Sequence, residues 1–417
     1  MRQPTALRHL ASARAVAPAL VIALVAFAAW YAMLGAPARR WHERGVEASS
    51  RTHFRDLVTI LAGAECAAAG YDVLVQNPCD PDGTPMNYPR LWVALIDGSG
   101  AQSTSVRSLG IALAVVFFLS TVALMRVRSA GGAVVWALAL LSPAVTLAVE
   151  RSNNDLVVFV LVVAATWLLP RERPAAAAPF LLFAGTLKLF PALAMPVLFL
   201  RRDRTLRILA GLCLVLFAAL VLLTFGDLEA IARATPHTGG LSYGGEVTAA
   251  QFLKLAGLVG NQPLLLTPDL RRAALACSVT LPLLGVSLGL LARRRSVGLA
   301  PDPTLAMPFL AGTLIFVGTF ALGSNWDYRL TFLLLALPGS FAAAGGAWGQ
   351  GWVARLGALA CGCLLVALWA GGSFPRSWPW LLRVVLSRLD AAATPLLVVL
   401  LVALATAAMR IAKTPDT

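Results

Sequence analysis

The sequence predicts an all-α polytopic membrane protein with about ten full transmembrane helices, a broken helical hairpin and an external loop that carries a surface helix. Hydrophobic residues make up 59% of the 417 residues, charged residues only 13%, and the mean hydropathy is +0.77. No soluble fold could bury so much apolar surface in one core. We therefore expect residues 1–417 to form a single integral membrane domain. Apolar runs long enough for membrane helices fall at about 15–36, 108–125, 132–149, 155–169, 175–200, 208–225, 273–292, 304–322, 330–345, 353–371 and 391–409.

The first apolar run, 15–36, follows three arginines, Arg2, Arg8 and Arg14. It can span a hydrocarbon core and is longer than the usual apolar part of a signal peptide. We interpret it as an uncleaved anchor, with a cleaved signal as the alternative.

The net charge of +14 does not predict a nucleic-acid partner, because the basic residues fall in short clusters between apolar runs rather than in one stripe. Membrane topology explains these clusters better. The one Lys-Thr pair, Lys413-Thr414, follows Ala412, so the sequence has no P-loop and nothing in it indicates ATP.

The positive-inside rule places the N-terminus in the cytoplasm, the 37–106 loop outside, and Arg126 and Arg128 inside. If 175–200 crossed once, the arginines at 201–207 and every later basic cluster would lie outside. Lys188-Leu189-Phe190-Pro191 interrupts this run, so two short helices could enter the membrane and return. The prediction is ten crossings plus this hairpin, in the inner or plasma membrane of the cell, with both termini cytoplasmic.

In this topology, four polar segments share the extracytoplasmic face: the external loop 37–106, the second external loop 226–272, and the turns at 150–155 and 324–329. Within the first loop, Ser49 or Ser50 can cap a helix that Gly70 can end. Its apolar residues recur at helical spacing on one side and its polar residues lie on the opposite side. This pattern predicts a helix that lies on the membrane surface, with Asp56 pointing away from the membrane. The apolar side comprises Phe54, Leu57, Val58 and Leu61, and the opposite side Thr52, Asp56, Thr59 and Gly63.

Asp56 is the first candidate for chemistry, because a helix at the membrane surface can hold a carboxylate where a lipid-borne and a water-borne substrate meet. A general base must reach the proton that it accepts. The alternative is a carboxylate on a solvated helix face.

Three further polar groups could bind a substrate. In the 150–155 turn, Glu150, Arg151 and Asn154 could orient a polar substrate or anchor the span ends at the interface. Lys188, in the middle of an apolar run, could meet a phosphate, or could snorkel or pair with a nearby carboxylate. His237 is a loop histidine and is a substrate-binding candidate, with a plain polar loop residue as the alternative.

Asp327, Tyr328 and Arg329 close a span at the outer face. Arg329 could grip a phosphate with its forked donors. The alternative is an Asp327–Arg329 pair beside the interfacial aromatic residues Trp326 and Tyr328.

Two short patterns in the first loop favour structure over catalysis. Asp80-Pro81-Asp82 matches the D-x-D that binds metal in some sugar transferases, but Pro81 and Gly83 make a turn the better account. We assign no metal ligands and no certain cofactor, although a divalent cation stays open. Cys66 and Cys79 both lie in this loop, so we expect them to form a disulfide.

Several motifs follow one another over residues 15–345: Asp56 in the loop helix, Gly70-Tyr71-Asp72, Asn87-Tyr88-Pro89, the 150–155 turn, Leu187-Lys188-Leu189-Phe190-Pro191 and Asn325-Trp326-Asp327-Tyr328-Arg329. Together they resemble glycosyltransferases of the C superfamily, and most of all glycosyltransferase family 87, which includes phosphatidylinositol-mannoside mannosyltransferases.

This resemblance implies an inverting cell-envelope enzyme that moves a hexose such as mannose from a polyprenyl-phosphate sugar to a lipid or glycan hydroxyl on the extracytoplasmic face. It transfers the role of the base to Asp56. The donor, the acceptor and membrane lipids are the expected partners. A lipid or polysaccharide transporter or flippase is the alternative, with Lys188 on the substrate path, and a structural partner of envelope enzymes is a third reading.

Overall fold

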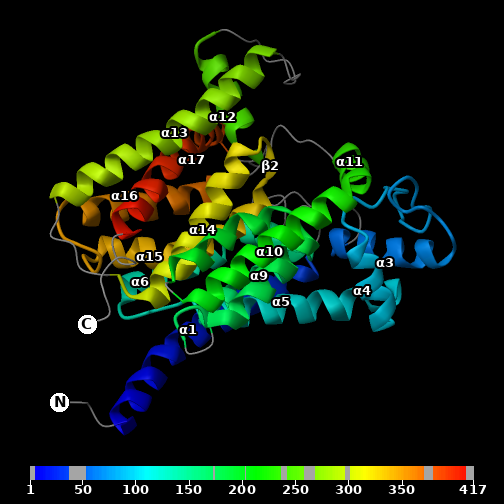
Figure 1. Ribbon diagram of the computed structural model, residues 1–417, viewed down its shortest axis with the longest axis horizontal. Helices are drawn as coiled ribbons and strands as arrows, with labels where there is room; N and C mark the ends of the chain where they lie inside the picture. Colours follow the sequence, from blue (N-terminus) through cyan, green and yellow to red (C-terminus); the bar gives the residue numbers. More distant parts are fainter. Residues whose placement is uncertain are drawn as a thin grey trace.

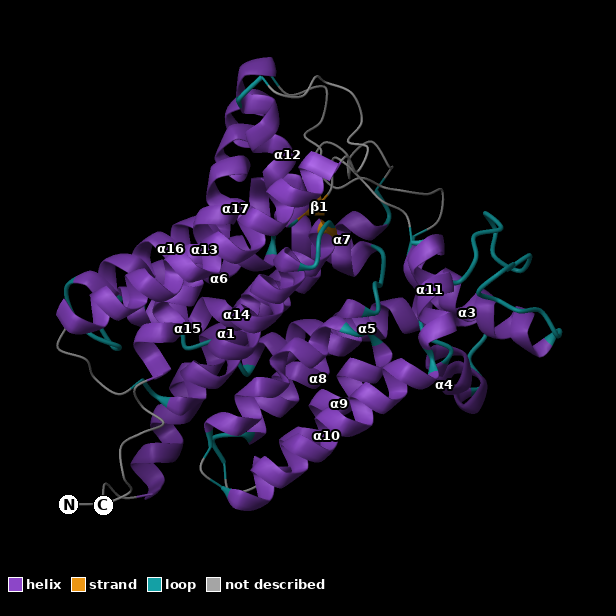
Figure 2. Ribbon diagram, turned by 45° about the horizontal axis from the view of Figure 1, so that its top comes forward, coloured by secondary structure: helices purple, strands orange, loops and turns teal. Residues whose placement is uncertain are grey.

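The computed structural model describes residues 5–36, 53–171, 174–201, 203–235, 242–257, 268–295, 301–370 and 379–409. Helices are the dominant regular structure in this part of the chain, joined by loops, and the strands are two very short ones (Figure 2). The predicted all-α class is therefore confirmed.

The elements follow one another in a simple order along the chain (Figure 1). The α-helices are α1 (Thr5–Leu34), α3 (Arg55–Ala68), α4 (Leu91–Ser99), α5 (Val106–Val122), α6 (Ala130–Leu140), α7 (Pro143–Glu150), α8 (Asp155–Leu168), α9 (Ala177–Leu187), α10 (Arg204–Leu223), α11 (Phe225–Ala234), α12 (Gly245–Leu255), α13 (Pro268–Arg295), α14 (Pro303–Ala321), α15 (Leu333–Ala344), α16 (Trp352–Ala370) and α17 (Trp380–Ala408). Short 3₁₀ helices are η1 (Ser103–Ser105), η2 (Pro174–Ala176), η3 (Phe190–Leu200) and η4 (Asp327–Phe332), and the strands are β1 (Ser242–Tyr243) and β2 (Asn325–Trp326).

Seven helices in the described residues are long and apolar enough to cross a membrane, or eight if α6 and α7, bent by 47° at their junction, form one broken span. The other predicted apolar runs form shorter helices, α8, α9, η3 and the 12-residue α15. The protein is thus a polytopic membrane protein with fewer long spans than apolar runs. The figure of ten crossings stays a prediction.

The 175–200 run breaks where the sequence predicts. Helix α9 ends at Leu187, Lys188 is extended (φ −155°, ψ 136°), and η3 starts at Phe190. A Cβ atom at Gly185 would lie 3.4 Å from Cε of Met195, so η3 folds back beside α9. The break turns Lys188 away from helical geometry at the tip of this hairpin.

Helices α13 and α17 pack closely because glycines leave room for backbone contact. A Cβ atom at Gly285 would lie 2.7 Å from the carbonyl oxygen of Val399, and one at Gly289 would lie 2.5 Å from that of Ala403. Two small residues four positions apart are a recurrent device for close helix approach in membranes.

The first long polar loop, 37–106, places α3 and α4 at one end of the molecule, next to α11 of the 226–272 loop (right in Figure 1). Arg90 links these parts, because its guanidinium contacts Asp72 (2.8 Å) and Asp227 (3.0 Å). These charge pairs therefore tie the segment after α3 to α11.

Helix α3 ends just before Gly70 (φ 89°), as predicted, but begins at Arg55, and the expected Ser49 or Ser50 cap lies outside the described residues. The side expected to face water is covered instead: Asp56, Thr59 and Gly63 are buried. The turn segment after α3, residues 70–90, returns over Thr59 and Gly63, so that Met86 contacts Gly63. The 150–155 turn covers Asp56. Helix α3 is thus enclosed on both sides.

Candidate active site

Asp56 lies in the first turn of α3 and faces the turn between α7 and α8. Two backbone hydrogen bonds fix it there: the N–H of Phe54 donates to the carbonyl oxygen of Glu150 (2.9 Å), and that of Asp56 donates to the carbonyl oxygen of Arg151 (3.1 Å). Arg151 donates to both carboxylate oxygens of Asp56, at 2.6 and 3.0 Å. The amide of Asn153 donates to Oδ2 at 2.5 Å.

The backbone at Phe54 is strained in order to start α3 at this point. Its φ is 62°, a left-handed conformation that costs a bulky residue about 1–3 kcal/mol. The ring packs tightly on α5, because a Cβ atom at Gly110 would lie 2.7 Å from Cδ1 of Phe54. This contact and the bond to Glu150 hold the strained turn that aims Asp56.

Asp155 lies next to two cationic side chains that are distant in sequence, Lys188 and Arg329. Its side chain is fully buried at the start of α8, and Nζ of Lys188 forms an ion pair with its Oδ1. Lys188 also donates to Oδ1 of Asn153 at 3.2 Å. Nε of Arg329 lies 3.6 Å from Oδ2 of Asp155, too far for a hydrogen bond, and this buried N–H has no hydrogen-bond partner among the described residues.

We call these five residues, Asp56, Arg151, Asp155, Lys188 and Arg329, the charge cluster. It joins three cations to two carboxylates, so it carries one excess positive charge in a buried place. The cationic side chains keep 12–19% of their surface exposed, whereas the carboxylates keep 8% and 0%. Its accessible surface is therefore mainly cationic, which favours an anionic ligand.

Aromatic rings frame the cations. Nζ of Lys188 lies 5.3 Å from the ring centre of Tyr88 and 5.8 Å from that of Tyr328, and the guanidinium of Arg329 lies 4.5 Å from the ring of Phe190. Such contacts stabilise a cation that has lost part of its water. Tyr88, from the Asn87-Tyr88-Pro89 motif, thus brings the 37–106 loop next to the cluster.

The protonation state of Asp56 follows from its neighbours. Burial alone would raise its pKa, but the charge of Arg151 and the hydrogen bonds from Arg151 and Asn153 outweigh burial, so the pKa of Asp56 lies below its ordinary value. The carboxylate is ionised at neutral pH and able to accept a proton.

Asp327 does not pair with Arg329, as one reading of the sequence expected. It is buried, and neither carboxylate oxygen has a hydrogen-bond partner among the described residues. Burial, together with the charge of Asp390, raises the pKa of Asp327 well above its ordinary value, which favours its protonated form. Arg329 bonds instead to Oδ1 of Asn325 and faces Asp155.

The other candidates take separate positions. The side chain of Glu150 leaves the charge cluster and meets Nδ1 of His53 at 3.3 Å. Asn154 is buried, and its amide has no hydrogen-bond partner within the described part of the chain. His237 lies outside the described residues.

Nothing in the sequence pattern separates Asn153 and Asp155 from their neighbours in the turn. The one available signal was Lys188, since a lysine in an apolar run needs a nearby carboxylate. The pairing of Lys188 with Asp155 fits the alternative considered for that lysine.

Asp80 and Asp82, the two acids of the D-x-D pattern, both form ion pairs with Arg55. Two nitrogens of Arg55 donate to Asp80, each at 2.7 Å, and Nε contacts Asp82 at 2.9 Å. Among the described residues, no three His, Cys, Asp or Glu side chains are grouped to hold a metal ion. These two acids therefore serve the fold of the loop.

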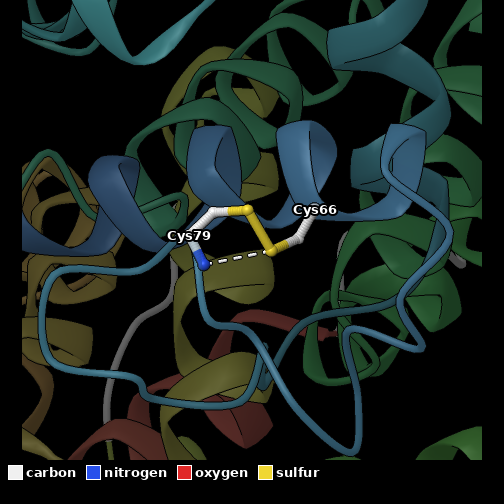
Figure 3. The surroundings of a disulfide bond; sticks show 2 residues. All are labelled: Cys66 and Cys79. Atoms are coloured by element: carbon white, nitrogen blue, oxygen red, sulfur yellow. Dashed lines mark hydrogen bonds between the residues drawn. A yellow bond between two sulfur atoms is a disulfide. The ribbon is translucent and has the colours of Figure 1, made fainter.

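Cys66 on α3 is joined to Cys79 in the turn segment by a disulfide (Figure 3). The N–H of Cys79 also donates to Sγ of Cys66 at 3.0 Å. The bond ties the segment that carries Asp80 and Tyr88 to the helix that carries Asp56.

The long apolar helices define a polytopic membrane protein, and the buried charge cluster in it carries one excess positive charge. The chain matches glycosyltransferase family 87 over residues 100–319, more than half of its length. It belongs to this family and is a membrane glycosyltransferase. The match contains the 150–155 turn and Lys188, whereas Asp56 and Arg329 lie outside it. No curated protein and no solved structure gives a significant match.

Proposed function

We propose that this enzyme moves a hexose, with mannose as the first candidate, from a polyprenyl-phosphate donor to a lipid or glycan hydroxyl on the extracytoplasmic face, with inversion at the anomeric carbon. The observation that supports this proposal most is the excess positive charge of the charge cluster beside an ionised carboxylate. A phosphate donor and a hydroxyl acceptor need this combination.

Lys188 and Arg329 would bind the phosphate. The unpartnered Nε of Arg329 can donate to a phosphate oxygen, and Lys188 adds a point charge. As the bond between the anomeric carbon and the phosphate oxygen breaks, the departing phosphate gains negative charge. The two cations lower the barrier only if they hold this charge more tightly than the intact donor.

Asp56 would accept the proton of the acceptor hydroxyl. A carboxylate has about four lone-pair positions. Arg151 and Asn153 occupy three of those on Asp56, which leaves one for the incoming hydroxyl. Because the pKa of Asp56 is low, proton transfer comes late, when the new bond between the hydroxyl oxygen and the anomeric carbon has made that proton strongly acidic.

The test is an assay with purified protein, a polyprenyl-phosphate sugar labelled in the sugar, and a lipid extract as the acceptor source. We expect label in a new glycolipid or glycan, and a loss of about 100-fold or more in turnover for Asp56→Asn, because the amide cannot take the proton. Donor binding should persist in this variant. Asp97→Asn, an exposed carboxylate of the same loop, is the matched control and should keep full activity.

Movement of the donor across the membrane without sugar transfer would instead favour a transporter. Near-normal turnover of Asp56→Asn would exclude the base role.

A further inference from the structure

A cavity lies on the other side of α3 from the charge cluster. It has a volume of about 590 Å³, within the usual range for small-molecule sites. Phe54 and Val58 form its α3 wall. At about 100° per residue, Val58 projects from the helix roughly opposite to Asp56. Phe54 lies immediately before the first helical residue.

The cavity lies between the ends of two candidate membrane spans. Leu34 is the last residue of α1, Val106 is the first residue of α5, and both line the cavity. Helices α1 and α5 pack against each other below it. The ends of adjacent spans are the level at which lipid headgroups meet a membrane protein.

The polar lining of the cavity is basic. Arg107 is exposed at the start of α5 and forms no ion pair with any described residue. Below it, apolar side chains of α1 and α5 are open to the membrane, among them Val25 (58% exposed), Val116 (48%) and Leu119 (46%). A cation above an open apolar surface matches an amphiphile with an anionic head.

We propose that this cavity binds the anionic headgroup of a membrane phospholipid, with its acyl chains along α1 and α5. Arg107 would hold the phosphate, and Phe54 and Val58 would contact the glycerol region. His53 also lines the cavity, and its Nδ1 lies 3.3 Å from Oε1 of Glu150. The lipid would therefore lie one residue away from the turn that carries Arg151, although it takes no part in sugar transfer.

The experiment measures lipid binding by native mass spectrometry of the full-length protein, with phosphatidylglycerol and phosphatidylcholine of identical acyl chains. No sugar donor is present, so the result is independent of the proposed reaction. We expect the wild type to prefer phosphatidylglycerol. Arg107→Gln should reduce this preference about fivefold, the usual effect of one arginine near an anionic surface.

Val58→Trp, which fills the cavity, should weaken the binding of both lipids. Arg271→Gln is the matched control, an exposed arginine near the start of α13, and should leave the preference intact. Equal binding of the two lipids by the wild type would overturn the proposal. An unchanged preference for phosphatidylglycerol in Arg107→Gln would also overturn it. Because the Arg107 side chain is exposed, we expect this variant to fold like the wild type.

Discussion

Asp155 serves two cations at once. It pairs with Lys188 and approaches Arg329 while its own side chain has no exposed surface. Removing one member of a buried pair leaves the other charge uncompensated, which usually costs about 3–5 kcal/mol.

Asp155→Asn should therefore lower the thermal stability of the purified protein strongly. Lys188→Met in the same chain should restore part of it, because the uncompensated ammonium is removed. Thermal unfolding monitored by intrinsic fluorescence measures both effects, with Asp269→Asn, an exposed carboxylate on α13, as the control. An unfolding temperature for Asp155→Asn equal to that of the wild type would show that the pair does not stabilise the fold.

The environment of Asp80 predicts that the stability of the fold depends on pH. Burial is the largest single influence and opposes its charge, but the hydrogen bonds from Arg55, the backbone N–H of Asp82 and the charge of Arg55 together lower the pKa of Asp80 below its ordinary value. The unfolded chain then binds more protons than the folded chain as the pH falls. The stabilisation is fully present above the unfolded pKa of about 3.9 and is lost as the pH falls through the lower folded value.

We expect the unfolding temperature of the wild type to fall steeply below about pH 4. Asp80→Asn should be less stable than the wild type at pH 7 and should show a shallower fall. Unfolding scans between pH 7 and pH 3 check this. The same steepness in Asp80→Asn and the wild type would contradict the assignment.

At the scale of single elements, the disulfide joins α3 to the turn segment across 13 residues of sequence. Closing a loop of about this length stabilises a fold by roughly 3 kcal/mol in the chain-entropy description. The double variant Cys66→Ser/Cys79→Ser should unfold at a lower temperature. Reductant should lower the unfolding temperature of the wild type only; equal sensitivity in the variant would point to another cause.

The hairpin of α9 and η3 could be predicted from the sequence, because Lys188 and Pro191 mark its break within four residues. The environment of α3 could not. Its helical pattern describes the helix alone, and the pattern does not show that residues after Gly70 return to cover Thr59 and Gly63.

Single residues show the same limit. Asp56 was singled out as the proton acceptor by position and resemblance, yet its contacts with Arg151 and Asn153 cross 95 and 97 residues of sequence. The approach of Asp155 to Arg329 is also long-range. Pairings at such separations leave no local pattern, so the charge cluster emerges only from the folded chain.

At the scale of the whole molecule, segments from four parts of the chain build one site. Helix α3, the turn after α7, the tip of the α9–η3 hairpin and η4 each contribute to the charge cluster. A ladder of rings beneath it joins α5, α8, η4 and η3, with ring centres 5.1–5.8 Å apart. These packed rings support the elements that carry the charges. The family match over residues 100–319 includes only some of the residues of the charge cluster.

The most direct measurement is a structure of the protein bound to a non-transferable polyprenyl-phosphate sugar. We expect the phosphate within hydrogen-bond distance of Lys188 and Arg329, with the anomeric carbon on the side of Asp56. A phosphate bound elsewhere, with the charge cluster empty, would contradict it.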